Sequence, residues 1–245
     1  MTELILYDHR SSICSQMARL ALVEKGLSFK RRQVDIMETN EQFEPWYVAL
    51  NPRAVVPTLA IDDEIVTDTV RIVNRVDMFD GPDLSGDETT ADWLRDIMAL
   101  HYGVLLYRKR VEPDGTAPQI VARGKYLEQL SKERPGLANV VSSRLEGNRR
   151  FQRLLRDQEG IAVHLDATKD LIHQMKESVA KAPFLAGEKY SLADCFATAA
   201  LARFTIHRLT AWWKGTALED YYSRMKERPS YALAEVVDTG SERDL

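Results

Sequence analysis

Residues 4–26 decide the fold, and they read LILYDHRSSICSQMARLALVEKG. The apolar run at 4–7 predicts a buried strand, and the polar stretch at 8–12 predicts a loop. Apolar residues then recur at helical spacing until Gly26, a residue typical of a helix end. The stretch therefore predicts a strand, a short loop and a helix, which together open an α/β unit.

The next segments extend this unit outward along the chain. Residues 29–34 predict a second strand, and residues 38–50 carry apolar and aromatic side chains at helical spacing. Residues 55–61 and 64–66 predict a hairpin around Asp62-Asp63, and a helix over 67–78 completes the unit. The predicted order is β-α-β-α-β-β-α, a small mixed sheet with helices on its faces.

The remainder of the chain predicts only helices, because apolar residues recur at three and four and never alternate convincingly. Turn-forming residues mark a linker over 81–90, which separates a domain at 1–80 from an all-helical domain at 91–245. The predicted helices cover 91–110, 161–182 and 191–210. The charged stretch 118–156, broken by Pro135-Gly136, either extends the helical layer or forms an insertion.

The amino-acid composition restricts the classes of function that are open to the chain. The 245 residues include 33 lysines and arginines against 37 aspartates and glutamates, a net charge of −4. This balance argues against a nucleic-acid or anionic-membrane partner. Two cysteines, and an N-terminus without a signal peptide or a membrane span, predict a cytoplasmic protein. The sequence contains no metal-ligand cluster, phosphate loop or dinucleotide fingerprint, so neither a metal nor a nucleotide is implied.

Cys14 is the most informative single residue. It follows the loop at the start of the first helix, where unpaired N–H groups and the helix dipole stabilise a thiolate and are expected to lower its pKa. No C-x-x-C partner is present, so any redox cycle needs an external thiol. Free cysteines are more often inert and buried, and that interpretation fits Cys195 within its apolar run. Serines before a helix are more often caps.

Two further motifs lie in the first domain. A proline opening a strand, as in Val56-Pro57, is the usual setting for a cis peptide that leaves the Val56 backbone available to a ligand. Asp68-Thr69 starts the last helix of the domain and suits a zwitterionic amino-acid head. Asp68 would take the ammonium, and Thr69 with the helix N-terminus would take the carboxylate. A plain helix cap is the alternative.

Cys14, Val56-Pro57 and Asp68-Thr69, in this order and spacing, resemble the glutathione transferase superfamily over nearly the whole chain. The resemblance implies a thioredoxin-like domain followed by an all-helical one, glutathione as cosubstrate and a homodimer. It implies glutathione contacts at Val56, Pro57, Asp68, Thr69 and Gln42, and a structural capping box at Ser191-Leu192-Ala193-Asp194. The chain departs from the commoner family pattern at Asn51-Pro52-Arg53-Ala54 and at Asp68-Thr69.

Within the superfamily, the sequence is similar to the zeta class and to the hydroquinone reductive dehalogenases. The stretches that carry this similarity are 12–15, 40–45, 54–59 and 102–107. In those dehalogenases the matching cysteine takes glutathione sulfur from the substrate, which implies that role for Cys14 and a place in xenobiotic catabolism. Conjugation or isomerisation, with Ser12 or Ser15 stabilising the glutathione thiolate, is the alternative.

The second domain is expected to supply the electrophile pocket. The candidate lining residues, which are polar or aromatic and lie on two predicted helices, are His101, Tyr102, Tyr107, Arg108, Phe204, His207, Trp212 and Trp213. His101 and His207 are candidate bases for a phenol. Aromatic residues at helical spacing are more often core. A non-catalytic binding protein with this fold is the remaining alternative, and it predicts no affinity for glutathione.

Overall fold

The computed structural model describes residues 2–238, and its sheet has the strand order β2-β1-β3-β4. β1 is parallel to β2 and antiparallel to β3, and β4 returns antiparallel to β3. The elements of this region are β1 (Leu4–Asp8), α1 (Ile13–Glu24), β2 (Lys30–Gln33), the 3-10 turn η1 (Glu41–Phe43), α2 (Pro45–Leu50), β3 (Thr58–Ile61), β4 (Glu64–Val66) and α3 (Thr69–Asp77). The predicted order β-α-β-α-β-β-α is confirmed.

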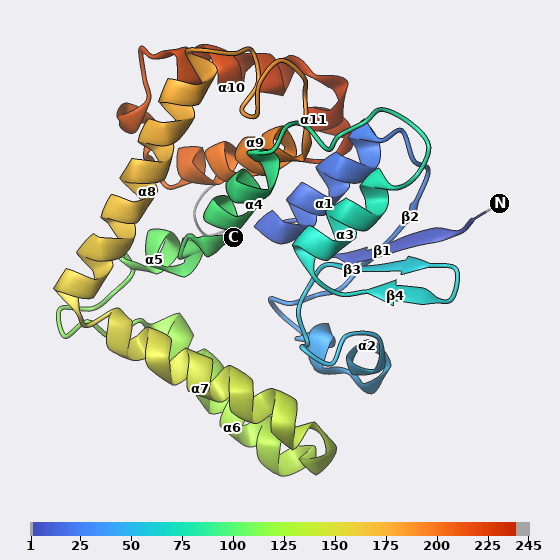
Figure 1. The fold of residues 1–245 in the computed structure, drawn as a ribbon. Coiled ribbons are helices and arrows are strands. Elements are labelled where there is room, and N and C mark those ends of the chain that lie inside the picture. Colours follow the sequence, from blue (N-terminus) through green and yellow to red (C-terminus); the bar gives the residue numbers. More distant parts are fainter. Residues whose placement is uncertain (1, 239–245) are drawn as a thin grey trace. The chain divides into compact units, whose positions relative to one another are not determined.

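Helices cover both faces of the sheet. Leu4, Leu6 and Asp8 are the buried residues of β1, and α1 and α3 lie side by side over one face (Figure 1). Tyr7 alternates to the other face, where its ring lies 6.4 Å from that of Tyr47 in α2. β1 is therefore a central strand, and the loop after it ends directly at α1.

Prolines set two of the element boundaries. The stretch 38–50 forms η1 and α2 instead of one helix, and Pro45 occupies the first turn of α2, where its missing N–H costs nothing. The strand predicted from 55 begins only at Thr58, because Pro57 cannot donate to the ladder.

The rest of the described chain is helical, as predicted, with differences in detail. Its helices are α4 (Thr90–Ala99), α5 (Tyr102–Tyr107), α6 (Pro118–Glu133), α7 (Ala138–Leu154), α8 (Gln158–Val179), α9 (Leu192–Ile206), α10 (Ala217–Glu227) and α11 (Pro229–Leu233), with 3-10 turns η2 (Pro135–Leu137) and η3 (Thr210–Trp212). The stretch 118–156 holds the helices α6 and α7, joined by η2.

The single helix expected over 91–110 is wrong. The chain leaves the helix after Ala99 and starts again at Tyr102. His101 causes the restart, because its Nδ1 accepts a hydrogen bond from the N–H of Val104 and so caps α5. Histidine is not among the residues that usually cap a helix. The helical spacing of apolar residues over 91–110 therefore gave no sign of the break at His101.

The chain forms two compact units. Of the described residues, the first unit contains 2–51, 55–99 and 170–238, and the second contains 52–54 and 100–169. In the second unit, Ala117, Ile120 and Leu155 form a small core. The division into domains at 81–90 remains a prediction from sequence. Between residues 2 and 238, no helix combines the length and the apolar character needed to cross a membrane.

Candidate functional site

The start of α1 carries the three residues predicted to be catalytic, and its geometry separates their roles. Ser12 is the N-cap, and its Oγ accepts a hydrogen bond of 3.3 Å from the N–H of Ser15. Ser15 is completely buried, and its own Oγ accepts from the N–H of His9 at 3.3 Å. Both serines therefore shape the turn that holds Cys14 in place, and only Ser12 is partly exposed.

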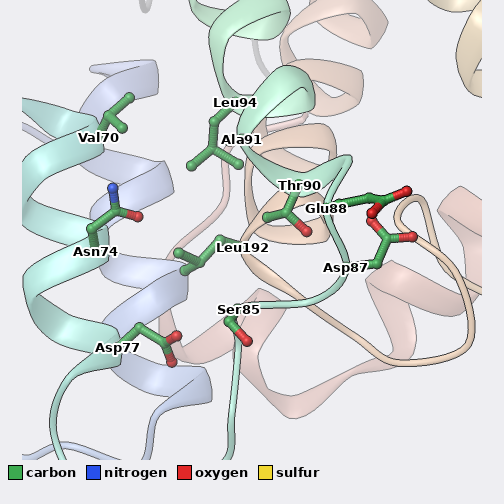
Figure 2. Close-up of a pocket in the computed structure, with 10 residues that line it drawn as sticks. All are labelled: Val70, Asn74, Asp77, Ser85, Asp87, Glu88, Thr90, Ala91, Leu94 and Leu192. Carbon is green, nitrogen blue, oxygen red and sulfur yellow. The ribbon is translucent and has the colours of Figure 1, made fainter.

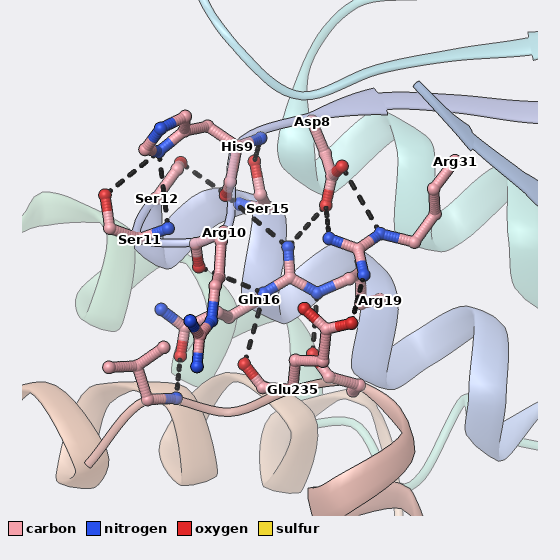
Figure 3. A network of polar contacts seen from close by, with 12 residues as sticks. Asp8, His9, Arg10, Ser11, Ser12, Ser15, Gln16, Arg19, Arg31 and Glu235 are labelled. Carbon is pink, nitrogen blue, oxygen red and sulfur yellow. Dashed lines mark hydrogen bonds and ion pairs between the residues drawn. The ribbon is translucent and has the colours of Figure 1, made fainter. Parts of the chain in front are cut away.

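A buried ionic network anchors the loop before α1 (Figure 3). Arg19 of α1 forms an ion pair with Asp8 at the end of β1, and both side chains are fully buried. Arg31 of β2 approaches the same carboxylate at 3.1 Å. Arg19 also donates to the main-chain oxygen of Arg10 at 3.2 Å and to that of Ala234 at 2.6 Å. The loop is thus fixed from β1, from α1 and from the segment after α11.

Cys14 is half-buried, and its surroundings differ from the expectation of a lowered pKa. Burial raises the pKa of the Cys14 thiol, and the nearby Asp68 adds to that rise. A hydrogen bond from the Thr69 side chain and the charge of Arg203 act in the opposite direction. The prediction of a lowered pKa was wrong, because burial of the thiol outweighs the two groups that stabilise the thiolate.

Asp68 and Thr69 stand at the start of α3. Asp68 is the N-cap, and its Oδ1 accepts from the N–H groups of Val70 at 3.0 Å and Arg71 at 3.2 Å. The cap interpretation is therefore confirmed, and a role of Asp68 in binding glutathione stays a prediction. Thr69 is nearly buried, and its side chain lowers the pKa of the Cys14 thiol. α3 packs against α1 here.

The other predicted glutathione contacts lie in the same unit. The Val56-Pro57 peptide is cis, as predicted. The preceding residue, Val55, accepts hydrogen bonds through its main-chain oxygen from the Tyr47 hydroxyl at 2.6 Å and from Asn51 Nδ2 at 2.8 Å. Gln42 lies in η1 and is almost fully buried. Buried side chains therefore fix the approach to the cis bond.

The second cysteine confirms its structural interpretation. Cys195 is completely buried in α9, where burial strongly raises its pKa and the Tyr190 hydroxyl lies 3.5 Å from Sγ. The predicted capping box at Ser191 and Asp194 is present in full. The first turn of α9, including Ser191, Asp194 and Cys195, is therefore buried in the core.

Arg203 was missed by the sequence analysis. It lies in α9 next to Phe204, and its Nη2 donates to the main-chain oxygen of Ser11. A single basic residue within the apolar run 195–206 was the signal that could have identified it, because a buried cation needs a compensating partner.

The aromatic residues of the later helices divide between core and surface. Phe204 and Trp213 are buried, and their ring centroids lie 6.3 Å apart. His207 is also buried, at the end of α9, whereas Trp212 in η3 is partly exposed. Of these four, Trp212 alone has accessible side-chain surface of any size in the first unit.

The remaining predicted pocket residues belong to the second unit. The His101 ring lies 5.0 Å from the rings of both Phe151 and His164, and burial together with His164 lowers the pKa of His101. Tyr107 packs against Phe151 at 5.9 Å, and Arg108 donates to the main-chain oxygen of Leu105. Tyr102 opens α5 and is partly buried. The Nδ1 of His101 is engaged in the cap of α5, so this ring nitrogen is not available to take a proton.

A separate cavity of about 360 Å³ lies between α3 and α4 (Figure 2). It is lined by Val70, Asn74, Asp77, Ser85, Asp87, Glu88, Thr90, Ala91, Leu94 and Leu192. None of the residues predicted to act on glutathione or on an electrophile is among them. The cavity is therefore distinct from the Cys14 site.

Comparison with known proteins assigns the class. Residues 11–77 match the glutathione S-transferase N-terminal domain, and residues 150–229 match the glutathione S-transferase C-terminal domain. A tetrachloro-p-hydroquinone reductive dehalogenase of Sphingobium chlorophenolicum is 32% identical over 97% of this chain and 97% of its own length. The chain therefore belongs to the glutathione S-transferase family, whose cosubstrate is glutathione.

Solved structures agree on the fold. The beta-etherase of Sphingobium sp. strain SYK-6 superimposes with a TM-score of 0.70 at 20% identity, covering 94% of this chain and 98% of the other. A theta class glutathione S-transferase of Xanthomonas axonopodis pv. citri, solved with glutathione bound, gives 0.64 at 19% identity, covering 98% and 99%. The fold is that of a glutathione transferase: a small mixed-sheet domain followed by helices.

Proposed function

We propose that this protein is a glutathione-dependent reductive dehalogenase of a halogenated hydroquinone, with Cys14 as the redox residue. The observation that carries the proposal is the setting of Cys14, a partly exposed thiol in the first turn of α1 directly after the N-cap Ser12 and Ile13. The similarity to a reductive dehalogenase along nearly the whole chain supports it.

The proposed reaction uses two glutathione molecules. The first glutathione thiolate forms a carbon–sulfur bond to the ring, and halide leaves. The Cys14 thiolate then attacks the glutathionyl sulfur, so that a disulfide forms while the carbon–sulfur bond breaks, and the ring carbon takes the electron pair and a proton. A second glutathione thiolate attacks the mixed disulfide and releases glutathione disulfide. The ring is reduced, glutathione is oxidised, and Cys14 is regenerated.

We assign the glutathione contacts to the residues around Cys14. Asp68 would bind the γ-glutamyl ammonium, while Thr69 and the N-terminus of α3 would bind its carboxylate. The backbone of Val56, before the cis peptide, would pair with the cysteinyl part. Pro57 and Gln42 would border the same site. Thr69 would then contact both the bound glutathione and Cys14, the residue that receives the glutathione sulfur.

The electrophile contacts stay a proposal from the sequence, and they are His101, Tyr102, Tyr107, Arg108, Phe204 and Trp212. The His101 Nδ1 accepts from the N–H of Val104, so the neutral ring carries its hydrogen on Nε2 and would donate a hydrogen bond to a phenolate oxygen.

Conjugation without reduction is the second candidate function, and one observation favours a particular serine for it. The Ser12 Oγ accepts from the N–H of Ser15, which leaves its hydroxyl hydrogen able to donate to a glutathione sulfur. Ser15 is buried behind Ser12 and is a poorer candidate. This route consumes one glutathione per turnover and leaves the ring carbon–sulfur bond intact.

Product analysis of the wild type and of Cys14→Ser tests the proposal. Halogenated hydroquinones, epoxides and aryl halides form the panel, and glutathione consumed per turnover is counted. We expect two per turnover on a hydroquinone for the wild type, and a glutathionyl adduct that accumulates for the variant. Normal reduced product from Cys14→Ser would overturn the role of Cys14. The non-catalytic alternative predicts no glutathione binding by calorimetry.

We also propose that the protein is a cytoplasmic homodimer. The homodimer rests on the family resemblance. The cytoplasm rests on the two cysteines and on a reaction that needs a compartment in which glutathione stays reduced. Sedimentation of the purified protein tests the dimer, and a monomer at micromolar concentration would contradict it. Cell fractionation tests the compartment, and recovery outside the cytoplasm would contradict that assignment.

A further inference from the structure

Helix α9 is apolar along most of its length, and Arg203 is its single basic residue. Its other charged residue, Asp194, is used in the capping box of the helix itself. Arg203 is only 8% exposed. Burying a guanidinium costs free energy unless hydrogen bonds and nearby charge compensate for it. The groups around Arg203 therefore explain its presence in the core.

The guanidinium extends from α9 to the turn before α1. Its Nη2 donates to the main-chain oxygen of Ser11, the residue that precedes the N-cap Ser12. The main-chain oxygen of Ser12 accepts the first helical hydrogen bond, from Gln16 at 3.0 Å. Arg203 thus holds the backbone at the point where α1 begins, two residues before Ile13-Cys14.

The charge of Arg203 also acts on the Cys14 sulfur. Burial raises the pKa of Cys14, and Arg203 is one of the groups that lower it. A guanidinium stays protonated at every pH at which the protein is folded, unlike a histidine in the same place. The support for a negative sulfur is therefore constant across the working pH range.

We propose that Arg203 is a positioning residue for the Cys14 thiolate, holding the turn that carries Cys14 and supplying positive charge beside the sulfur. Its importance for turnover rests on the proposed function, in which the thiolate attacks the glutathionyl sulfur. Arg203 acts through the Ser11 turn and through its charge, and it takes no part in bond making. The planar guanidinium of arginine provides the hydrogen bond to the Ser11 turn. Either arginine or lysine at position 203 provides the positive charge near Cys14.

The test measures alkylation of Cys14 by iodoacetamide against pH, with peptide mass mapping, in the intact protein. Arg203→Gln should alkylate about tenfold more slowly at pH 8, because losing the charge raises the thiol pKa and leaves less thiolate to react. The deficit should shrink as pH rises and the thiolate forms in both proteins. Arg203→Lys should recover most of the rate at pH 8. Arg208→Gln, an exposed arginine just beyond the end of α9, is the matched control and should behave as the wild type.

A purely structural role gives a different pattern. If Arg203→Gln and Arg203→Lys slow alkylation equally at every pH, or if Arg203→Gln leaves the rate unchanged, the proposal is overturned. Circular dichroism checks whether Arg203→Gln folds. If it does not, the comparison of Arg203→Lys with the wild type tests the proposal, because lysine keeps the charge and the pH dependence of Cys14 alkylation should then be unshifted. Alkylation needs no turnover, so a reduced product from Cys14→Ser would reject the proposed function and leave this result standing.

Discussion

The starts of α1 and α9 look alike in sequence and differ in their surroundings. Each helix begins with a serine N-cap, Ser12 or Ser191, and each carries a free cysteine in its first turns, Cys14 or Cys195. The start of α9 is closed, with its cap, its acidic partner and its cysteine all buried. At α1 the cap and the cysteine are partly exposed.

The difference lies in how deeply each sulfur is buried. Burial and Asp68 raise the pKa of Cys14, while the Thr69 side chain and the Arg203 charge lower it. Cys195 has the same kinds of neighbour, because the Tyr190 side chain and the Arg228 charge lower its pKa while burial, Glu24 and Asp194 raise it. Cys195 is completely buried, whereas Cys14 is partly exposed. A helix start alone therefore does not make a thiol reactive, and access to the sulfur separates the two.

The largest expected difference is in thiol chemistry. In the folded protein, iodoacetamide should modify Cys14 about 10³-fold faster than Cys195, because the latter becomes accessible only when the core opens. The Cys14 rate should rise with pH through the neutral and alkaline range, since its pKa is raised and the thiolate forms late. Peptide mass mapping gives both rates in one sample. Equal rates for the two thiols would remove the contrast.

Substitution of each cysteine should separate function from packing. Cys14→Ser should lower the formation of reduced product by at least about 100-fold, because a hydroxyl cannot accept the glutathionyl sulfur. Cys195→Ala is the control, and its turnover should stay within about twofold of the wild type at a temperature where it is folded. Product chromatography measures both variants. Comparable losses in the two variants would contradict the assignment.

The two helix caps should differ in stability when their acidic residues are changed. Asp194→Asn should lower the free energy of unfolding by about 3 kcal/mol, because its carboxylate accepts from Leu185, Ser191 and Tyr221 in the core. Asp68→Asn should change it by less than about 0.5 kcal/mol, because asparagine caps a helix nearly as well. Urea titration gives both values. A small effect at Asp194 would show that the closed start is not a major source of stability.

A smaller loss of stability than at Asp194 is expected at Ser12, the N-cap of α1. Ser12→Ala should lower the free energy of unfolding by about 1 kcal/mol, the usual value for a lost cap. If Ser12 is only a cap, reduction per folded molecule should stay near the wild-type rate. A large loss of glutathione conjugation in a folded Ser12→Ala protein would instead favour the serine route.

Most of the correct predictions from the sequence came from short patterns of neighbouring residues. The order of helices and strands along the first 80 residues, the cis Val56-Pro57 bond and the caps at Asp68 and Ser191 depend on residues adjacent in the chain. The break at His101 was missed because a histidine cap is rare among helix starts. The pKa of Cys14 was mispredicted because burial and the opposing groups come from segments distant in sequence. Arg203 was overlooked for the same reason.

The most direct test of the central claim is to trap the mixed disulfide. The wild-type enzyme is quenched with acid during turnover of a halogenated hydroquinone with glutathione, and its peptides are mapped by mass spectrometry without reductant. We predict a glutathione adduct on the peptide that carries Cys14, sensitive to dithiothreitol, and an unmodified Cys195 peptide. Turnover to reduced product without any adduct on Cys14, or with the adduct on Cys195, would contradict the assignment of Cys14 as the redox residue.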